Sequence, residues 1–193
     1  MARVRTKLYL ITGLLLSVLS ISGCPRQTMG PDTTQLKPDG RVAFQREGFS
    51  IKPPEGYRDN GPSFWHFMNF LGPEEGDFTV NCTVGAHKDE GKQIEDAGPV
   101  AEVAMCKWLS NYHPDKADQG FVNFGGRKTY FCSGTYEWSG RAVKCLMYCL
   151  RGGNGRVYVI VYTAPVETFN RHRHDFEQSA RTIDIEPQLA TKD

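Results

Sequence analysis

Residues 127–162 read RKTYFCSGTYEWSGRAVKCLMYCLRGGNGRVYVIVY, and this stretch decides the fold. Ser139-Gly140 is a two-residue turn signal, so the segments on either side, 128–138 and 141–151, are predicted to pair as an antiparallel hairpin. Gly152-Gly153-Asn154-Gly155 then turns the chain again and leads into a third strand. The stretch therefore predicts a three-stranded antiparallel meander.

Both faces of this meander are apolar. The hairpin register places Cys132 opposite Met147 on one face and Phe131 opposite Tyr148 on the other. The third strand is an unbroken apolar run without alternation, which is typical of a strand buried on both faces. We therefore expect two buried sets on opposite faces of that strand: Val157, Val159 and Val161 on one, and Tyr158, Ile160 and Tyr162 on the other.

The flanking sequence supplies further strands and two helices. Residues 64–71 are almost wholly apolar and 77–87 alternate, so they are predicted to form a second hairpin. Helices are predicted over about 99–112 and 166–182. The first has an apolar stripe of Ala101, Ala104, Met105, Trp108, Leu109 and Tyr112, and the second covers the sheet through Phe169, Phe176, Ala180 and Ile183.

The order of elements and three segments of sequence resemble the PsbP-like family, which includes DcrB-like bacterial lipoproteins. The segments are FSIKPPEGY at 49–57, the meander at 130–150, and GRVYVIVYTAP at 155–165. The resemblance implies an α+β fold in which an antiparallel sheet carries helices on both faces, an α/β/α sandwich. These segments contain core and turn residues and no catalytic signature, so the resemblance implies a fold and no particular activity.

The first 23 residues have the pattern of a bacterial export signal. Three basic residues precede an apolar run from Leu8 to Ile21, and Ser22-Gly23 leads to Cys24. Ile21 to Cys24 resembles the lipobox, which implies cleavage before Cys24 and attachment of a lipid to its thiol. An uncleaved anchor with an incidental cysteine is the alternative.

The remaining chain reads as one domain. Residues 24–40 are predicted to be the lipidated cysteine and a flexible tether, 41–187 a single globular domain, and 188–193 a loose tail. Removing residues 1–23 leaves 20 Lys plus Arg against 22 Asp plus Glu, a formal charge of −2. This balance does not indicate a nucleic-acid partner.

The cysteines of the meander leave two interpretations open. Cys132 lies diagonally between Cys145 and Cys149, which are about 13 Å apart on one strand and cannot bond to each other. A disulfide from Cys132 to either one requires a shifted register or a displaced backbone. The other interpretation is that these thiols are small buried hydrophobic groups. The spacing of cysteines and histidines predicts no metal site, and no cofactor motif is found.

One segment has more aromatic side chains than a single strand needs. In residues 64–71 (FWHFMNFL), alternation places Trp65, Phe67 and Leu71 on one face. If that face is exposed, it is a partner or ligand surface; if the strand is central, the face is packed.

The predicted function is a lipid-anchored, non-enzymatic binding or assembly module of the bacterial cell envelope. The sequence favours it because no catalytic motif is found and the polar clusters fall in turns or on a helix face. Its expected partners are the membrane, through Cys24, and an envelope protein. A domain that binds a small apolar ligand between sheet and helix is the first alternative, and an envelope enzyme is the second.

Overall fold

The computed structural model describes residues 34–62 and 66–186. The helices are α1 (Ile94–Trp108) and α2 (Phe169–Arg181), with one 3₁₀ turn, η1 (Gln45–Glu47). The strands are β1 (Thr34–Leu36), β2 (Val42–Phe44), β3 (Phe49–Ile51), β4 (Arg58–Asp59), β5 (Met68–Glu75), β6 (Phe78–Lys88), β7 (His113–Phe124), β8 (Arg127–Trp138), β9 (Arg141–Arg151), β10 (Arg156–Pro165) and β11 (Asp184–Ile185). Within the described residues, no helix is long and apolar enough to cross a membrane.

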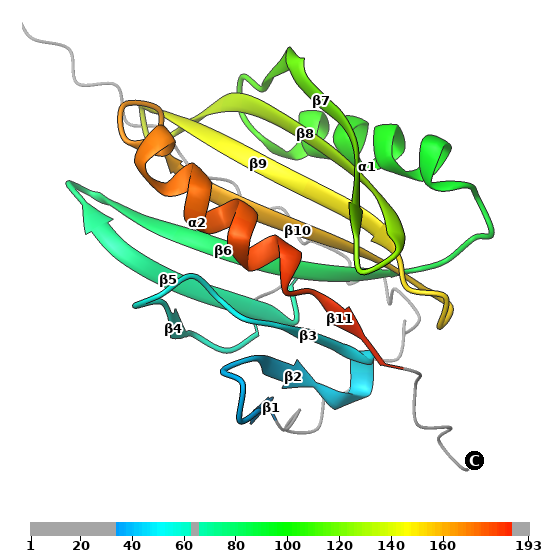
Figure 1. Cartoon of the computed structure of the whole chain (residues 1–193). Coiled ribbons are helices and arrows are strands. Elements are labelled where there is room, and N and C mark those ends of the chain that lie inside the picture. The colour runs from blue at the N-terminus through cyan, green and yellow to red at the C-terminus, as the bar shows by residue number, and fades with distance from the viewer. Residues whose placement is uncertain (1–33, 63–65, 187–193) are drawn as a thin grey trace, which may run out of the picture. The chain divides into compact units, whose positions relative to one another are not determined.

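A seven-stranded antiparallel sheet forms the centre, in the order β4-β5-β6-β10-β9-β8-β7 (Figure 1). The predicted hairpin of β8 and β9 is confirmed in its register, with Cys132 opposite Met147 and Phe131 opposite Tyr148. Its two turn residues both have positive φ, 51° at Ser139 and 80° at Gly140. That conformation matches the right-handed twist of the paired strands, so the two-residue turn fixes the register.

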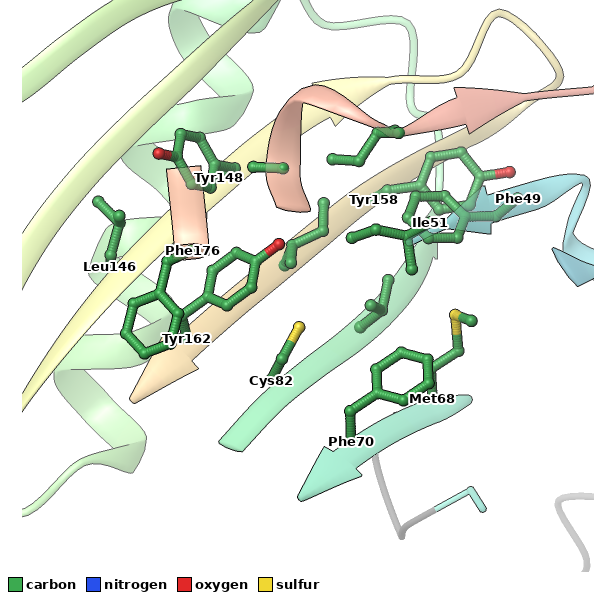
Figure 2. Packing of buried hydrophobic residues seen from close by; sticks show 14 of the residues in the cluster. Phe49, Ile51, Met68, Phe70, Cys82, Leu146, Tyr148, Tyr158, Tyr162 and Phe176 are labelled. Atoms are coloured by element: carbon green, nitrogen blue, oxygen red, sulfur yellow. The ribbon is translucent and has the colours of Figure 1, made fainter. Parts of the chain in front are cut away.

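Helix α2 and a small four-stranded sheet, β1-β2-β3-β11, pack on one face of the central sheet. The core there is aromatic: Tyr162 stacks on Phe176 with ring centroids 5.0 Å apart, and Phe49 lies 5.0 Å from Tyr158 (Figure 2). Tyr158, Ile160 and Tyr162 are fully buried on this face, as the sequence predicts. Phe169, Phe176 and Ala180 of α2 are buried too, which confirms the predicted core stripe of this helix.

Helix α1 lies on the opposite face, over β8 and β9 (Figure 1). Its buried contacts to the sheet involve Ile94 with Tyr130, Cys132, Met147 and Cys149. An antiparallel sheet with a helix on each face is the α/β/α sandwich that the sequence predicts, and this fold class is confirmed.

Two element predictions are wrong and one strand was not predicted, each for a local reason. Helix α1 spans 94–108 and has Pro99 inside it, so the proline does not mark its first turn. Strand β5 continues through Gly72-Pro73, beyond the predicted end of the strand at residue 71, and its pairing with β6 shifts register between Leu71 and Glu74. Strand β7 has no clear alternation in its sequence because its pairing with β8 shifts register between Asp115 and Gln119.

The predicted start of the domain is also wrong. Residues Thr34–Leu36 form β1 and pair with β2, so the segment 34–40 belongs to the folded domain instead of the tether. This strand was not predicted because it is only three residues long and all three residues are exposed, so the sequence has no apolar pattern there. Cys24 and the tail 188–193 lie outside the described residues.

Candidate functional site

The α1 face of the sheet is only partly covered, and a groove of about 800 Å³ lies between α1 and strands β6 and β10. Its floor is a ladder of opposed pairs from the two strands. These pairs are Val157 with His87, Val159 with Gly85, Val161 with Thr83, and Thr163 with Asn81. We call this hollow the valine groove. It was not located by a sequence motif, because its residues come from separate elements, chiefly α1, β6 and β10.

The three valines of the floor correct a sequence prediction. Val157, Val159 and Val161 are half-buried, whereas the tyrosines and isoleucine on the opposite face of β10 are fully buried. The reason is the position of α1, which covers β8 and β9 and leaves the neighbouring β10 and β6 open on this side. The apolar run of β10 thus serves two purposes, with a packed core on one face and a groove floor on the other.

The wall of the valine groove is the apolar stripe of α1. It is formed by Ala97, Val100, Ala101, Ala104 and Trp108, which recur at the three- and four-residue spacing of one helix face. Much of this stripe is exposed, including 54% of Val100 and 74% of Trp108. Of the stripe that was predicted to be core, Ala101 is partly buried against the sheet, whereas Ala104 and Trp108 are exposed and line the groove.

Two contacts hold α1 over β8. Gly98 lies against Tyr130, so closely that a Cβ atom at position 98 would be 2.3 Å from Cγ of Tyr130. The Tyr130 hydroxyl also donates a hydrogen bond of 2.7 Å to Oε2 of Glu102, whose side chain is buried. The glycine contact and the buried hydrogen bond both place the helix over β8 and not over β10.

The two ends of the valine groove differ in polarity. At the β10 end near Thr163, the lining is neutral and polar, with Asn81 and Tyr136 beside the threonine. Burial raises the pKa of Tyr136 above its ordinary range, so its hydroxyl stays protonated. This end therefore offers hydrogen-bonding groups without charge.

The opposite end has four charged residues, Lys88, Asp89, Glu90 and Lys92. Lys92 pairs with Glu90 at 2.9 Å, and Asp89 accepts a hydrogen bond of 2.8 Å from Nε of Arg151. Burial raises the pKa of Asp89, but the hydrogen bonds from Arg151 and the Gly91 amide outweigh it and leave the pKa lowered. Asp89, Glu90 and Lys92 are therefore already paired within the protein.

His66 lies on the β6 side of the valine groove. Its pKa is lowered, chiefly by burial and further by the nearby His87. Its imidazole is therefore neutral near pH 7, which suits a groove that is lined mostly by aliphatic side chains.

The described cysteines are all free thiols, and four of them are buried. Cys132 lies diagonal to Cys145 and Cys149, as the register predicts. Burial raises the pKa of both Cys145 and Cys149 to about 12, so these thiols are protonated at neutral pH and are weak nucleophiles. Among the described residues, no group of three His, Cys, Asp or Glu side chains is placed to hold a metal ion.

Of the predicted surface of Trp65, Phe67 and Leu71, Phe67 is not exposed. Phe67 is 7% exposed, and its ring packs 5.1 Å from Phe44 and 5.7 Å from Phe49 in the core. The alternation fails because β5 begins only at Met68, after a bend at Phe67. Leu71 is half-buried opposite Asn81, and Trp65 lies outside the described residues.

Comparison with solved structures defines the class of fold. LpqN of Mycobacterium tuberculosis, which is involved in cell envelope biogenesis, superposes with a TM-score of 0.57 at 12% identity over 72% of this chain and 83% of its own. Cyanobacterial PsbP from Synechocystis has a TM-score of 0.56 at 13% identity, covering 86% and 98% of the two chains. The Ran-binding protein Mog1p of Saccharomyces cerevisiae has a TM-score of 0.52 at 10% identity, covering 79% and 96%.

The chain therefore has the α/β sandwich fold that PsbP and Mog1p share. No protein-family model matches the sequence, and a search of curated proteins found no match. Identities of 10–13% show the fold alone, so the function has to be argued from the valine groove.

Proposed function

We propose that this protein is a non-enzymatic binding module of the bacterial cell envelope, which holds an apolar ligand in the valine groove. One observation supports the proposal above all. The α1 stripe and the β10 valines are two apolar surfaces that line a groove of about 800 Å³ between them. Exposed apolar surface is unfavourable in water, and a ligand between the two surfaces would bury both.

The size and lining of the valine groove fit this role. Ligand-binding pockets typically have volumes of about 300–1,000 Å³ and are lined mostly by apolar side chains with a few polar groups. The groove has that composition, with Asn81, Thr83 and Thr163 among aliphatic residues. Of the sequence-based alternatives, the geometry favours ligand binding between sheet and helix over a partner surface at Trp65, Phe67 and Leu71.

The envelope location is part of the proposal and rests on the N-terminal sequence. Cleavage before Cys24 and lipidation of its thiol would tether the domain to a membrane, with two or more acyl chains giving stable anchoring. A tethered domain meets membrane components at high local concentration. An apolar groove in such a domain suits ligands that are sparingly soluble and reside in the envelope.

Photolabelling tests the valine groove directly. Membranes that contain the full-length lipoprotein are treated with a photoactivatable alkyl diazirine, and labelled peptides are mapped by mass spectrometry. We expect labels in the peptides of α1 and β10. Val100→Glu places a carboxylate in the groove and should lower this labelling at least about tenfold, because burying an unpaired charge is costly.

Val103→Glu is the matched control. Val100 and Val103 lie on the same helix and are both 54% exposed, but only Val100 lines the groove. The Val103 variant should label like the unaltered protein. Equal labelling of the two variants would remove the proposed function.

A further inference from the structure

We propose that the ligand of the valine groove is a single-chain anionic amphiphile. Its chain lies along β10 with the methyl end near Thr163, and its head group lies outside the groove beside Lys88. The inference rests on the function proposed above. It adds the number of chains, the charge of the head group and the direction in which the ligand lies.

Helix α1 runs in the same direction as β10, so the valine groove is elongated along that strand. Gly98 contacts Tyr130, which the strand pairings place in line with Val159. Past the end of the helix, Tyr112 contacts β8 at a position that the pairings place in line with Thr163. The wall and the floor of the groove therefore extend side by side toward the Thr163 end.

The apolar part of the floor is long and one strand wide. Residues 157–163 of β10 rise by about 20 Å, at roughly 3.3 Å per residue. The residues of β6 that pair with the groove face of this segment are glycine or carry polar groups: His87, Gly85, Thr83 and Asn81. One extended alkyl chain would cover the row of valines, whereas a second chain beside it would lie against the polar groups of β6.

The hydrogen-bonding groups at the Thr163 end are already engaged within the protein. Thr163 is 6% exposed and has Tyr136 as its hydrogen-bonding neighbour. The Asn81 side chain donates a hydrogen bond of 3.1 Å to the carbonyl of Thr79. A charged head group at this end would lose its hydration without gaining a partner, so the methyl end of the chain fits here.

The opposite end of the groove is open to water and has one surplus positive charge. Its exposed lining residues are His87, Lys88, Glu90 and Lys92. The carboxylates of Asp89 and Glu90 are ion-paired with Arg151 and Lys92, whereas Lys88 has no ion pair among the described residues. A head group at this end keeps its hydration, and the charge of Lys88 favours an anion.

Palmitic acid with a diazirine at one or the other end of its chain tests the direction, on the full-length protein in membranes. After photolysis, the labelled peptides are mapped by mass spectrometry. The probe with the diazirine next to the methyl end should label the peptides that contain Trp108, Tyr136 and Thr163. The probe with the diazirine next to the carboxylate should label the peptide that spans 87–92. The reverse pattern, or the same pattern from both probes, would overturn the assigned direction.

Competition against the photoactivatable alkyl diazirine tests the charge of the head group. Palmitate should displace the label at a concentration about threefold lower than palmitoylcholine does, a ratio typical of one exposed ion pair. Lys88→Gln should abolish this preference. Lys107→Gln is the matched control and should keep it, because Lys107 is an exposed lysine of α1 that does not line the groove. A preference for palmitoylcholine, or one that persists in Lys88→Gln, would overturn the anionic head group.

The number of chains is tested with two lipids that share a head group. Monopalmitoyl phosphatidate should displace the label at a concentration at least about threefold lower than dipalmitoyl phosphatidate does. Equal or better displacement by the two-chain lipid would overturn the single chain.

The outcomes separate the two proposals. If labelling depends on Val100 but the two palmitic acid probes label the same peptides, the valine groove binds ligands and the assigned direction is wrong. Labelling that is insensitive to Val100→Glu would remove both proposals together.

Discussion

Asp118 joins the edge strand β7 to helix α2 through a bidentate ion pair. Its two carboxylate oxygens accept hydrogen bonds of 2.7 and 2.8 Å from the guanidinium of Arg173, and Ser133 donates a third of 2.7 Å. Arg173 has the largest effect on the pKa of Asp118 and lowers it, while burial opposes this and the Ser133 and Lys144 side chains lower it further. One carboxylate thus holds together two elements that are far apart in sequence.

This pair predicts a pH dependence of stability. The pKa of Asp118 is lower in the folded than in the unfolded protein, so its contribution is present above about pH 4 and lost as the pH falls through the folded pKa. Asp118→Asn should lower the free energy of unfolding by about 2 kcal/mol at pH 7, and by progressively less below pH 4.

Urea unfolding at pH 7, 5 and 3 measures this difference. Asp175→Asn, an exposed position on the same helix, should change stability little at any of these values. A loss for Asp118→Asn that is equally large at pH 3 and pH 7 would contradict the assignment to the ion pair.

At the scale of single elements, β10 has two unequal faces, one fully buried and one half-buried. The sequence shows only an unbroken apolar run, so it predicts burial on both sides and cannot show that α1 stops short of this strand. The register of β8 and β9 was predictable because it is set locally, by a turn of two residues with positive φ. The valine groove was not predictable from the sequence. It depends on the contacts of Gly98 and Glu102 with Tyr130, and these contacts join segments that are distant in the sequence.

The unequal faces of β10 predict opposite outcomes for two neighbouring substitutions. Ile160 is fully buried, so Ile160→Asp should cost more than about 4 kcal/mol and prevent folding. Val161 is half-buried on the groove face, where a carboxylate can reach water, so Val161→Asp should cost only about 1 kcal/mol.

Circular dichroism and urea unfolding compare the two variants. The Val161 variant should be folded but should lose photolabelling by the alkyl diazirine. If both substitutions unfold the protein equally, the groove face of β10 is as tightly packed as the core face, and the valine groove is not open.

At the scale of the whole molecule, the described domain contains the groove of the proposed function but does not determine where the protein is located. The sandwich itself was predictable from the pattern of apolar runs, and solved proteins with this fold include an envelope protein and a Ran-binding protein, so the fold fixes no compartment. The proposed location rests on residues 1–24. Their predicted role is to direct export, cleavage before Cys24 and attachment of a lipid to its thiol. Whether the domain meets an apolar ligand depends on that processing, because the groove is useful only where such ligands occur.

The last prediction therefore concerns Cys24, the cysteine in the lipobox position. Cys24→Ala removes the thiol that would receive the lipid, so the protein should no longer incorporate labelled fatty acid and should leave the membrane fraction or accumulate uncleaved. Cys106→Ala is the control, because Cys106 is an exposed free thiol within the folded domain and should keep both properties. Fractionation with metabolic labelling measures the two variants side by side. Fatty-acid incorporation that persists in Cys24→Ala would show that the anchor lies elsewhere, and loss of incorporation in Cys106→Ala would assign the lipid to the domain itself.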